Sequence, residues 1–87
     1  MQIVSSRKFQ KYFEKLTEKE QINVIEAVNS IKIAETFGDI THLKALKGFK
    51  NYFRLRVGNL RIGLYWDGDA FEIQDVGKRG DFYNRFP

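Results

Sequence analysis

The sequence predicts an α+β fold: a short N-terminal strand, a helical hairpin and then a three-stranded antiparallel meander forming one sheet, with the helices packed on one side. In the first half, apolar residues recur every three to four positions, which is the period of an amphipathic helix. In the second half, apolar and polar residues alternate, which is the period of a half-buried strand. A chain of 87 residues supports one hydrophobic core, so we expect residues 1–87 to form a single domain.

The first half contains two predicted helices after a strand at residues 2–5. Ser6 can cap the first helix, and Thr17 with Glu20 has the spacing of a capping box, which predicts the start of the second. Gly38 is expected to end the second helix. The predicted buried faces are Phe9, Tyr12, Phe13 and Leu16 in the first helix, and Ile22, Val24, Ile25, Ala27, Val28 and Ile31 in the second. Because the link between them is short, we expect the helices to pack as an antiparallel hairpin on the sheet.

A β-hairpin is predicted in the second half, with strands at Tyr52–Val57 and Leu60–Trp66. The dipeptide Gly58-Asn59 suits a two-residue turn because both residue types tolerate positive φ. One face of the hairpin is apolar and consists of Phe53, Leu55, Val57, Leu60, Ile62, Leu64 and Trp66. The other face carries Arg54, Arg56 and Arg61 between Tyr52 and Tyr65, with Gly63 leaving open space beside Arg54.

A third strand is predicted at residues 70–76, after a turn at Asp67-Gly68. The register that continues the apolar face pairs Trp66 with Asp69, Leu64 with Phe71 and Ile62 with Ile73. This register places Glu72 opposite Gly63, where it can neutralise Arg54, and Gln74 opposite Arg61.

The arginine face of the hairpin is expected to need a negatively charged partner. Arg56 lies opposite Arg61 in the predicted hairpin, and like charges that face each other across strands are destabilising. Either an anionic ligand binds there, or the side chains turn into water or pair with acidic neighbours. The net charge of +4 lies entirely in residues 43–87, which hold nine basic and five acidic side chains. This distribution predicts nucleic acid or an acidic protein as the partner.

Several classes of protein are excluded by composition. Cysteine is absent, which rules out disulfides and cysteine metal sites. The one histidine, His42, has no other ligands at metal-site spacing, so we interpret it as structural or exposed and expect no metal and no cofactor. No targeting signal or membrane-spanning stretch is evident, so the sequence predicts a cytoplasmic protein without a membrane partner.

The stretches LKALKGFKNYFRLRVGNLRIGLYW and VGKRGDFY resemble the RelE/ParE superfamily of toxins from toxin–antitoxin pairs, in the RelE-like branch. The order and spacing of these motifs match that family, and the predicted strand, helical hairpin and meander match its fold. The resemblance implies a cognate antitoxin protein as partner. It also implies one of two functions: RelE-like members are ribosome-dependent endoribonucleases that cut messenger RNA in the A site without metal, and ParE-like members inhibit DNA gyrase without catalysis.

Catalytic positions of RelE-like nucleases correspond to Arg54, Arg61, Arg79 and Tyr83 in this chain. The predicted RNA-binding residues around them are Lys44, Lys47, Lys50, Tyr52, Arg56 and Lys78. Two departures from the family pattern occur. Tyr52 stands where the best-known members have a further lysine, and Phe82 precedes Tyr83 where some relatives use a histidine.

The expected chemistry is attack of the RNA 2′-hydroxyl on the adjacent phosphorus. Arginines offer planar paired donors to the charged phosphorane, and Tyr83 is the candidate for proton transfer. Arginine holds its proton too tightly to act as an acid, and His42 is expected to lie outside the cluster. We therefore expect a poor nuclease in isolation, and a ribosome that orients the messenger RNA would relieve this deficit.

Overall fold

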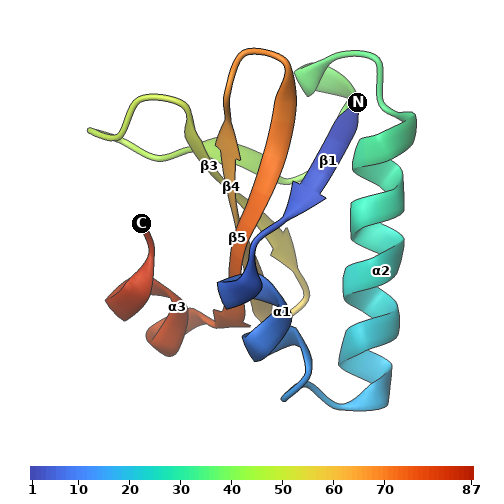
Figure 1. Ribbon diagram of the computed structural model, residues 1–87, viewed down its shortest axis with the longest axis vertical. Coiled ribbons are helices and arrows are strands. Elements are labelled where there is room, and N and C mark those ends of the chain that lie inside the picture. Colours follow the sequence, from blue (N-terminus) through green and yellow to red (C-terminus); the bar gives the residue numbers. More distant parts are fainter.

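The computed structural model describes residues 1–87 and confirms the α+β class, with one mixed sheet of five strands and helices around it (Figure 1). The elements in chain order are β1 (Gln2–Ser5), α1 (Arg7–Phe13), α2 (Glu18–Ile33), a 3₁₀ turn (Phe37–Asp39), β2 (Leu43–Ala45), β3 (Tyr52–Val57), β4 (Leu60–Trp66), β5 (Ala70–Lys78) and α3 (Arg79–Arg85). The strand order is β1-β5-β4-β3-β2, in which β1 runs parallel to β5 and the other pairs are antiparallel. No helix is long and apolar enough to span a membrane.

Both predicted helix starts are confirmed by their caps. The Ser6 hydroxyl accepts the Phe9 N–H at 3.1 Å. Thr17 and Glu20 exchange two side-chain to backbone hydrogen bonds, of 2.9 and 3.2 Å, which is a complete capping box. The second helix ends at Ile33, earlier than predicted, and the 3₁₀ turn follows before β2. Its buried positions are Val24 and Ile31, whereas Ile22 and Ile25 stay half exposed.

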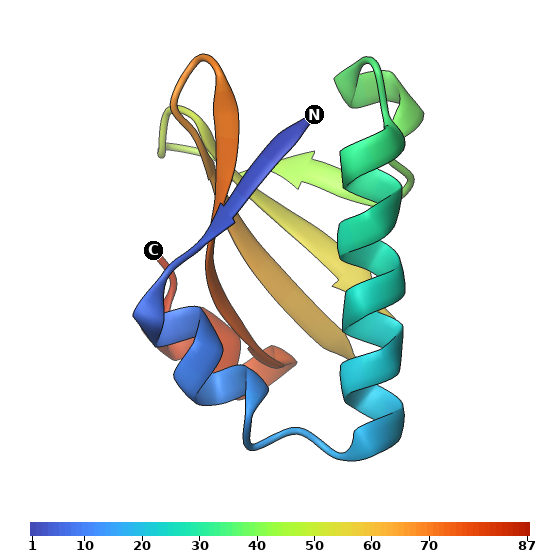
Figure 2. The ribbon, with the colours of Figure 1, turned by 45° about the vertical axis from the view of Figure 1, so that its right-hand side comes forward.

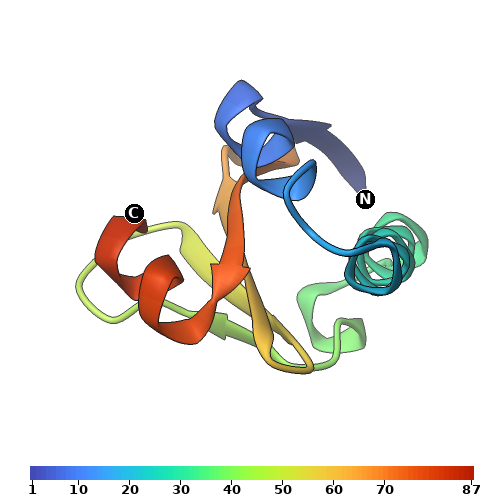
Figure 3. The same ribbon diagram turned by 90° about the horizontal axis from the view of Figure 1, so that it is seen from below.

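The two predicted helices, α1 and α2, contribute to one core on the apolar face of the sheet, as predicted, and the additional helix α3 lies on the opposite face. Figure 3 shows α2 on one side of the strands and α3 on the other. The short helix α1 packs on β5, and α2 lies across β1 and β3 (Figure 2). An apolar groove lies between the two helices. The predicted antiparallel packing of α1 along α2 is therefore absent. The physical reason is that α1 has only seven residues and enters directly from β1, which runs beside β5.

The central hairpin has the predicted register at every pair, from Tyr52 opposite Tyr65 to Val57 opposite Leu60. Its apolar face packs against α2 and contributes to the core. The buried core residues are Phe9, Val24, Ile31, Ala34, Ile40, Leu55, Leu60, Ile62, Leu64, Phe71, Ile73 and Val76.

The pairing of β4 with β5 differs from the prediction by two residues, because Trp66 lies opposite Phe71. The Asp67 carboxylate accepts the N–H groups of Asp69 and Ala70, so the turn sits at Gly68-Asp69. A register shift of two residues keeps each side chain on the same face of the sheet, and Phe71 remains in the core as expected. An irregularity beside Gly63 then moves the register by one more residue and turns Asp75 to the opposite face.

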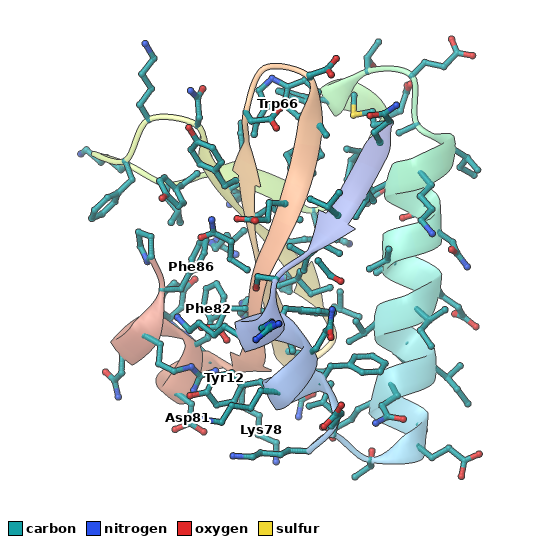
Figure 4. All side chains as sticks on the ribbon, in the orientation of Figure 1. Tyr12, Trp66, Lys78, Asp81, Phe82 and Phe86 are labelled. Atoms are coloured by element: carbon teal, nitrogen blue, oxygen red, sulfur yellow. The ribbon has the colours of Figure 1, made fainter.

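The second face of the sheet is covered by α3, which the sequence did not predict. Phe82 and Phe86 lie between this helix and the strands, and their rings stack 5.1 Å apart (Figure 4). The space beside Gly63 is not open, since a Cβ atom there would lie 2.6 Å from the Phe86 ring. Close approach of an aromatic ring is thus the reason for glycine at this position.

An ion pair holds α3 to the sheet. The fully buried Asp75 carboxylate accepts from Nε and Nη2 of Arg85, at 3.1 and 2.9 Å, and from the N–H of Val76 at 2.8 Å. The hydrogen bonds from Arg85 to Asp75 raise the pKa of the guanidinium group. The same guanidinium lies 3.9 Å from the centre of the Tyr12 ring, so it also joins α3 to α1.

Candidate functional site

Two rows of residues cross the face of the sheet that carries α3, and the basic side chains of the site belong to these rows. The first row runs from His42 through Arg56 and Arg61 to Gly77, and the second from Lys44 through Arg54 and Gly63 to Asp75. Neighbouring strands are about 5 Å apart, so members of one row are close neighbours. Because α3 covers the β4–β5 end of both rows, only the β2–β3 end remains open.

The open end forms a pocket of about 200 Å³, which we call the basic pocket, lined by His42, Lys44, Arg54 and Arg56. No apolar and no acidic residue lines it. The two ion pairs in the fold both belong to Asp75, so neither pocket arginine has a carboxylate partner. The predicted neutralisation of Arg54 is wrong, because Glu72 lies opposite Tyr65 and accepts from Gln74 Nε2 at 2.7 Å.

Arg61 lies next to the basic pocket, directly opposite Arg56. Its Nη1 donates to the carbonyls of Gly58 and Leu60, at 3.3 and 3.0 Å, which holds the guanidinium over the hairpin turn. Its Nε is buried without a hydrogen-bond partner. A buried donor without a partner is unfavourable, so this arginine is held in place at some cost in stability.

Arg79 and Tyr83 lie one helical turn apart on α3, and both are exposed. Neither makes a hydrogen bond or ion pair with Arg54 or Arg61. The Tyr83 side chain is 45% exposed, and its only aromatic neighbour is Phe82, at 5.3 Å between ring centres. The structure therefore places the two groups of predicted catalytic residues on adjacent elements, β3–β4 and α3, with no hydrogen bond or ion pair between them.

The predicted RNA-binding residues other than Tyr52 fall into three places. Lys44 and Arg56 line the basic pocket, and Lys47 and Lys50 are exposed in the loop between β2 and β3. Lys78 is separate, because it lines a second pocket with Tyr12 and Asp81 at the junction of α1, α2 and α3 (Figure 4).

Tyr52, one of the two departures from the family pattern in the sequence, belongs to an aromatic group. Its ring lies 4.9 Å from that of Tyr65 and 5.8 Å from that of Phe86. The side chain is half-buried and helps to seat the end of α3 on the sheet. This packing gives Tyr52 a structural role that a lysine would not fill.

His42 is exposed, as expected, but the prediction that it lies outside the arginine cluster is wrong. Its Nδ1 lies 3.4 Å from Arg56 Nη2, and its carbonyl accepts the Arg56 N–H at 3.4 Å. The sequence signal for this placement is weak, because the strand β2 that follows His42 has only three residues. No group of three or more histidine, aspartate or glutamate residues in the fold could hold a metal ion.

Comparisons with known proteins agree with this fold. No family model matches the chain. A segment of 45 residues, 52% of the chain, is 44% identical to Toxin RelE3 of Methanocaldococcus jannaschii, and the match spans about half, 51%, of that relative.

Two solved structures cover nearly the whole chain. The RelB–RelE antitoxin–toxin complex of Methanococcus jannaschii contains a chain with a TM-score of 0.82 and 25% identity, over 97% of this chain and 99% of that one. The RelBE2 toxin–antitoxin complex of Mycobacterium tuberculosis gives a TM-score of 0.73 and 18% identity, over 90% and 96%. The resemblance inferred from the sequence is therefore confirmed, and the chain is RelE-like in fold over nearly its whole length.

Proposed function

We propose that this chain is the toxin of a toxin–antitoxin pair and acts as a ribosome-dependent endoribonuclease on messenger RNA. The observation that supports the proposal most strongly is the basic pocket, in which three cations and a histidine gather without an acidic or apolar neighbour. Such a cluster is stabilised by an anion, and its arginines suit the paired oxygens of a phosphodiester. The class of reaction is the one implied by the resemblance of the sequence motifs to RelE-like toxins.

The scissile phosphate is proposed to bind between Arg54 and Arg56, with Arg61 beside them. Each of these donors faces the negative charge that builds up on the phosphorane when the 2′-oxygen attacks. Donors placed where charge develops contribute on the order of a hundred- to a thousandfold in rate. Arg79 and Tyr83 approach from α3, and Tyr83 is proposed to return a proton to the 5′-oxygen.

A large partner is part of this proposal because no hydrogen bond or ion pair within the chain joins the two groups of proposed catalytic residues. The side chains of Arg79 and Tyr83 are exposed and make no hydrogen bonds that would fix their positions. A ribosome would bring the messenger RNA into the pocket in one orientation, which removes much of the entropic barrier to the reaction.

A cognate antitoxin is proposed as the second partner, by analogy with the RelB–RelE complexes. The net charge of +4 favours an acidic antitoxin, since opposite charge accelerates association.

The proposal is tested by primer extension on a messenger RNA that is being translated in a purified system. We expect discrete cuts inside codons at the A site, which depend on ribosomes. Arg54→Ala is expected to lower the cleavage rate by about a hundred- to a thousandfold. Arg7→Ala is the matched control, because it removes the same charge from an exposed position on α1 and should cleave like the wild type.

Two results would contradict the proposal. Cleavage at the wild-type rate by Arg54→Ala would show that the basic pocket takes no part in the reaction. Intact RNA together with arrested growth would refute nuclease activity and direct the next assay to DNA supercoiling by gyrase.

A further inference from the structure

We propose that His42 is a catalytic residue of the basic pocket and accepts the proton that leaves the 2′-hydroxyl group. This inference rests on the proposed endoribonuclease function. The other predicted catalytic residues supply three arginines and a phenol, and none of these is an unprotonated base near neutral pH. Histidine changes its charge between pH 5 and 8, and His42 is the only histidine of the chain.

The backbone holds the His42 ring at the pocket. His42 precedes β2 with a φ of +66°, a conformation that few residues other than glycine adopt. Its carbonyl accepts the N–H of Arg56, which fixes this residue at the end of the β2–β3 ladder. Uncommon backbone conformations that the surrounding structure maintains are frequent at functional sites.

The side-chain contacts define which ring nitrogen is free to accept a proton. A guanidinium group only donates, so the 3.4 Å contact from Arg56 Nη2 requires a lone pair on Nδ1 and leaves the ring hydrogen on Nε2. The charged groups that face the ring are Lys44 from β2, and Arg54 and Arg56 from β3. All three are donors, and the imidazole is therefore the only side chain in the pocket that can take up a proton.

The proposed step begins when a phosphodiester enters the pocket. Arg56 then donates to a phosphate oxygen instead of Nδ1, a small loss because 3.4 Å is a long hydrogen bond. Nδ1 takes the proton of the 2′-hydroxyl while its oxygen bonds to phosphorus and the bond from phosphorus to the 5′-oxygen breaks. Tyr83 or a water molecule protonates the 5′-oxygen. The products are a 2′,3′-cyclic phosphate and a 5′-hydroxyl end.

His42→Asn is the decisive variant, because asparagine tolerates positive φ and its amide oxygen can still accept from Arg56, but it does not take up a proton. We expect its single-turnover cleavage rate on programmed ribosomes to fall by about a hundred- to ten-thousandfold. Binding to the same ribosomes should stay within about twofold of the wild type. Lys19→Gln, which alters an exposed cation on α2 outside the predicted site, is the control and should retain the wild-type rate.

The pH dependence separates proton transfer from positioning. The ratio kcat/KM of the wild type should rise with pH, because it reports the ionisation of the free protein. Its midpoint should coincide with the midpoint of the single imidazole C–H resonance in an NMR titration of the free protein. His42→Asn should lose this rise.

Three outcomes would overturn the assignment. His42→Asn with the wild-type rate and pH profile would exclude His42 while leaving the nuclease intact. A variant that is slower but keeps the wild-type pH profile would show a positioning residue instead of a proton acceptor. Absence of cleavage by the wild-type protein would refute the proposed function and this inference together.

Discussion

Replacing Asp75 by asparagine should destabilise the fold strongly through the loss of one charge. The Asp75 side chain has no exposed surface, and that of its partner Arg85 is 23% exposed. Asparagine keeps an acceptor for the Val76 N–H, but it leaves the Arg85 guanidinium without its counter-ion. Lys8 also loses a partner, since its Nζ lies 3.5 Å from the carboxylate.

The magnitude follows from burial. Breaking a buried ion pair by removing one partner costs about 3–5 kcal/mol, and the partial exposure of Arg85 lowers this to about 2–3 kcal/mol. A domain of this size has a total stability of roughly 4–13 kcal/mol, so the loss is a large fraction. At about 4–8 °C per kcal/mol, the Tm should fall by roughly 10–20 °C.

Urea unfolding followed by the fluorescence of Trp66, the only tryptophan, measures the effect. The urea concentration at the midpoint of unfolding should fall, whereas the dependence of the free energy of unfolding on urea concentration should not change. Asp69→Asn makes the same chemical change at an exposed turn carboxylate without a side-chain hydrogen bond, and should stay within about 0.5 kcal/mol of the wild type.

A double-mutant cycle of Asp75→Asn with Arg85→Met measures how much of the lost stability comes from the Asp75–Arg85 ion pair. Methionine is chosen because it keeps apolar contact with Tyr12. The double variant should lose less than the sum of the two single variants. A loss below about 0.5 kcal/mol in Asp75→Asn, or strictly additive losses, would refute the view that this pair holds α3 to the sheet.

Two further predictions concern packing and pH. Gly63→Ala should cost about 1–3 kcal/mol in urea unfolding, because the new Cβ atom meets the Phe86 ring at 2.6 Å. The double variant Gly63→Ala/Phe86→Ala should lose less stability than the sum of the losses of the two single variants. A Gly63→Ala protein as stable as the wild type would contradict the packing of this ring. Backbone N–H donors from Ala70 and Asp69 lower the pKa of Asp67, so its contribution to stability is present above its ordinary pKa and is lost as the pH falls through the lowered value. The urea midpoint should therefore decrease below about pH 4, and less steeply in Asp67→Asn, whereas equal decreases would exclude the Asp67 carboxylate as the cause.

Local sequence signals determined most elements of this protein, namely β1, α1, α2 and the three strands β3, β4 and β5, but not β2 and α3. The caps at Ser6 and Thr17 act within four residues of the chain, and alternation in the central hairpin defines its register, because one misplaced residue would expose the whole apolar face. The arginine row could be predicted for the same reason, since Arg56 and Arg61 are brought together by a two-residue turn.

Contacts between distant segments decided the rest. The placement of α3 depends on Asp75 and Gly63 meeting Arg85 and Phe86, and no periodic pattern in the sequence encodes such a pairing. The position of His42 at the basic pocket likewise depends on the pairing of β2 with β3. The strand β2 has only three residues, which is too short to give a clear alternation in the sequence. Periodicity reports which side of an element is buried, whereas only the assembled sheet determines which elements share that side.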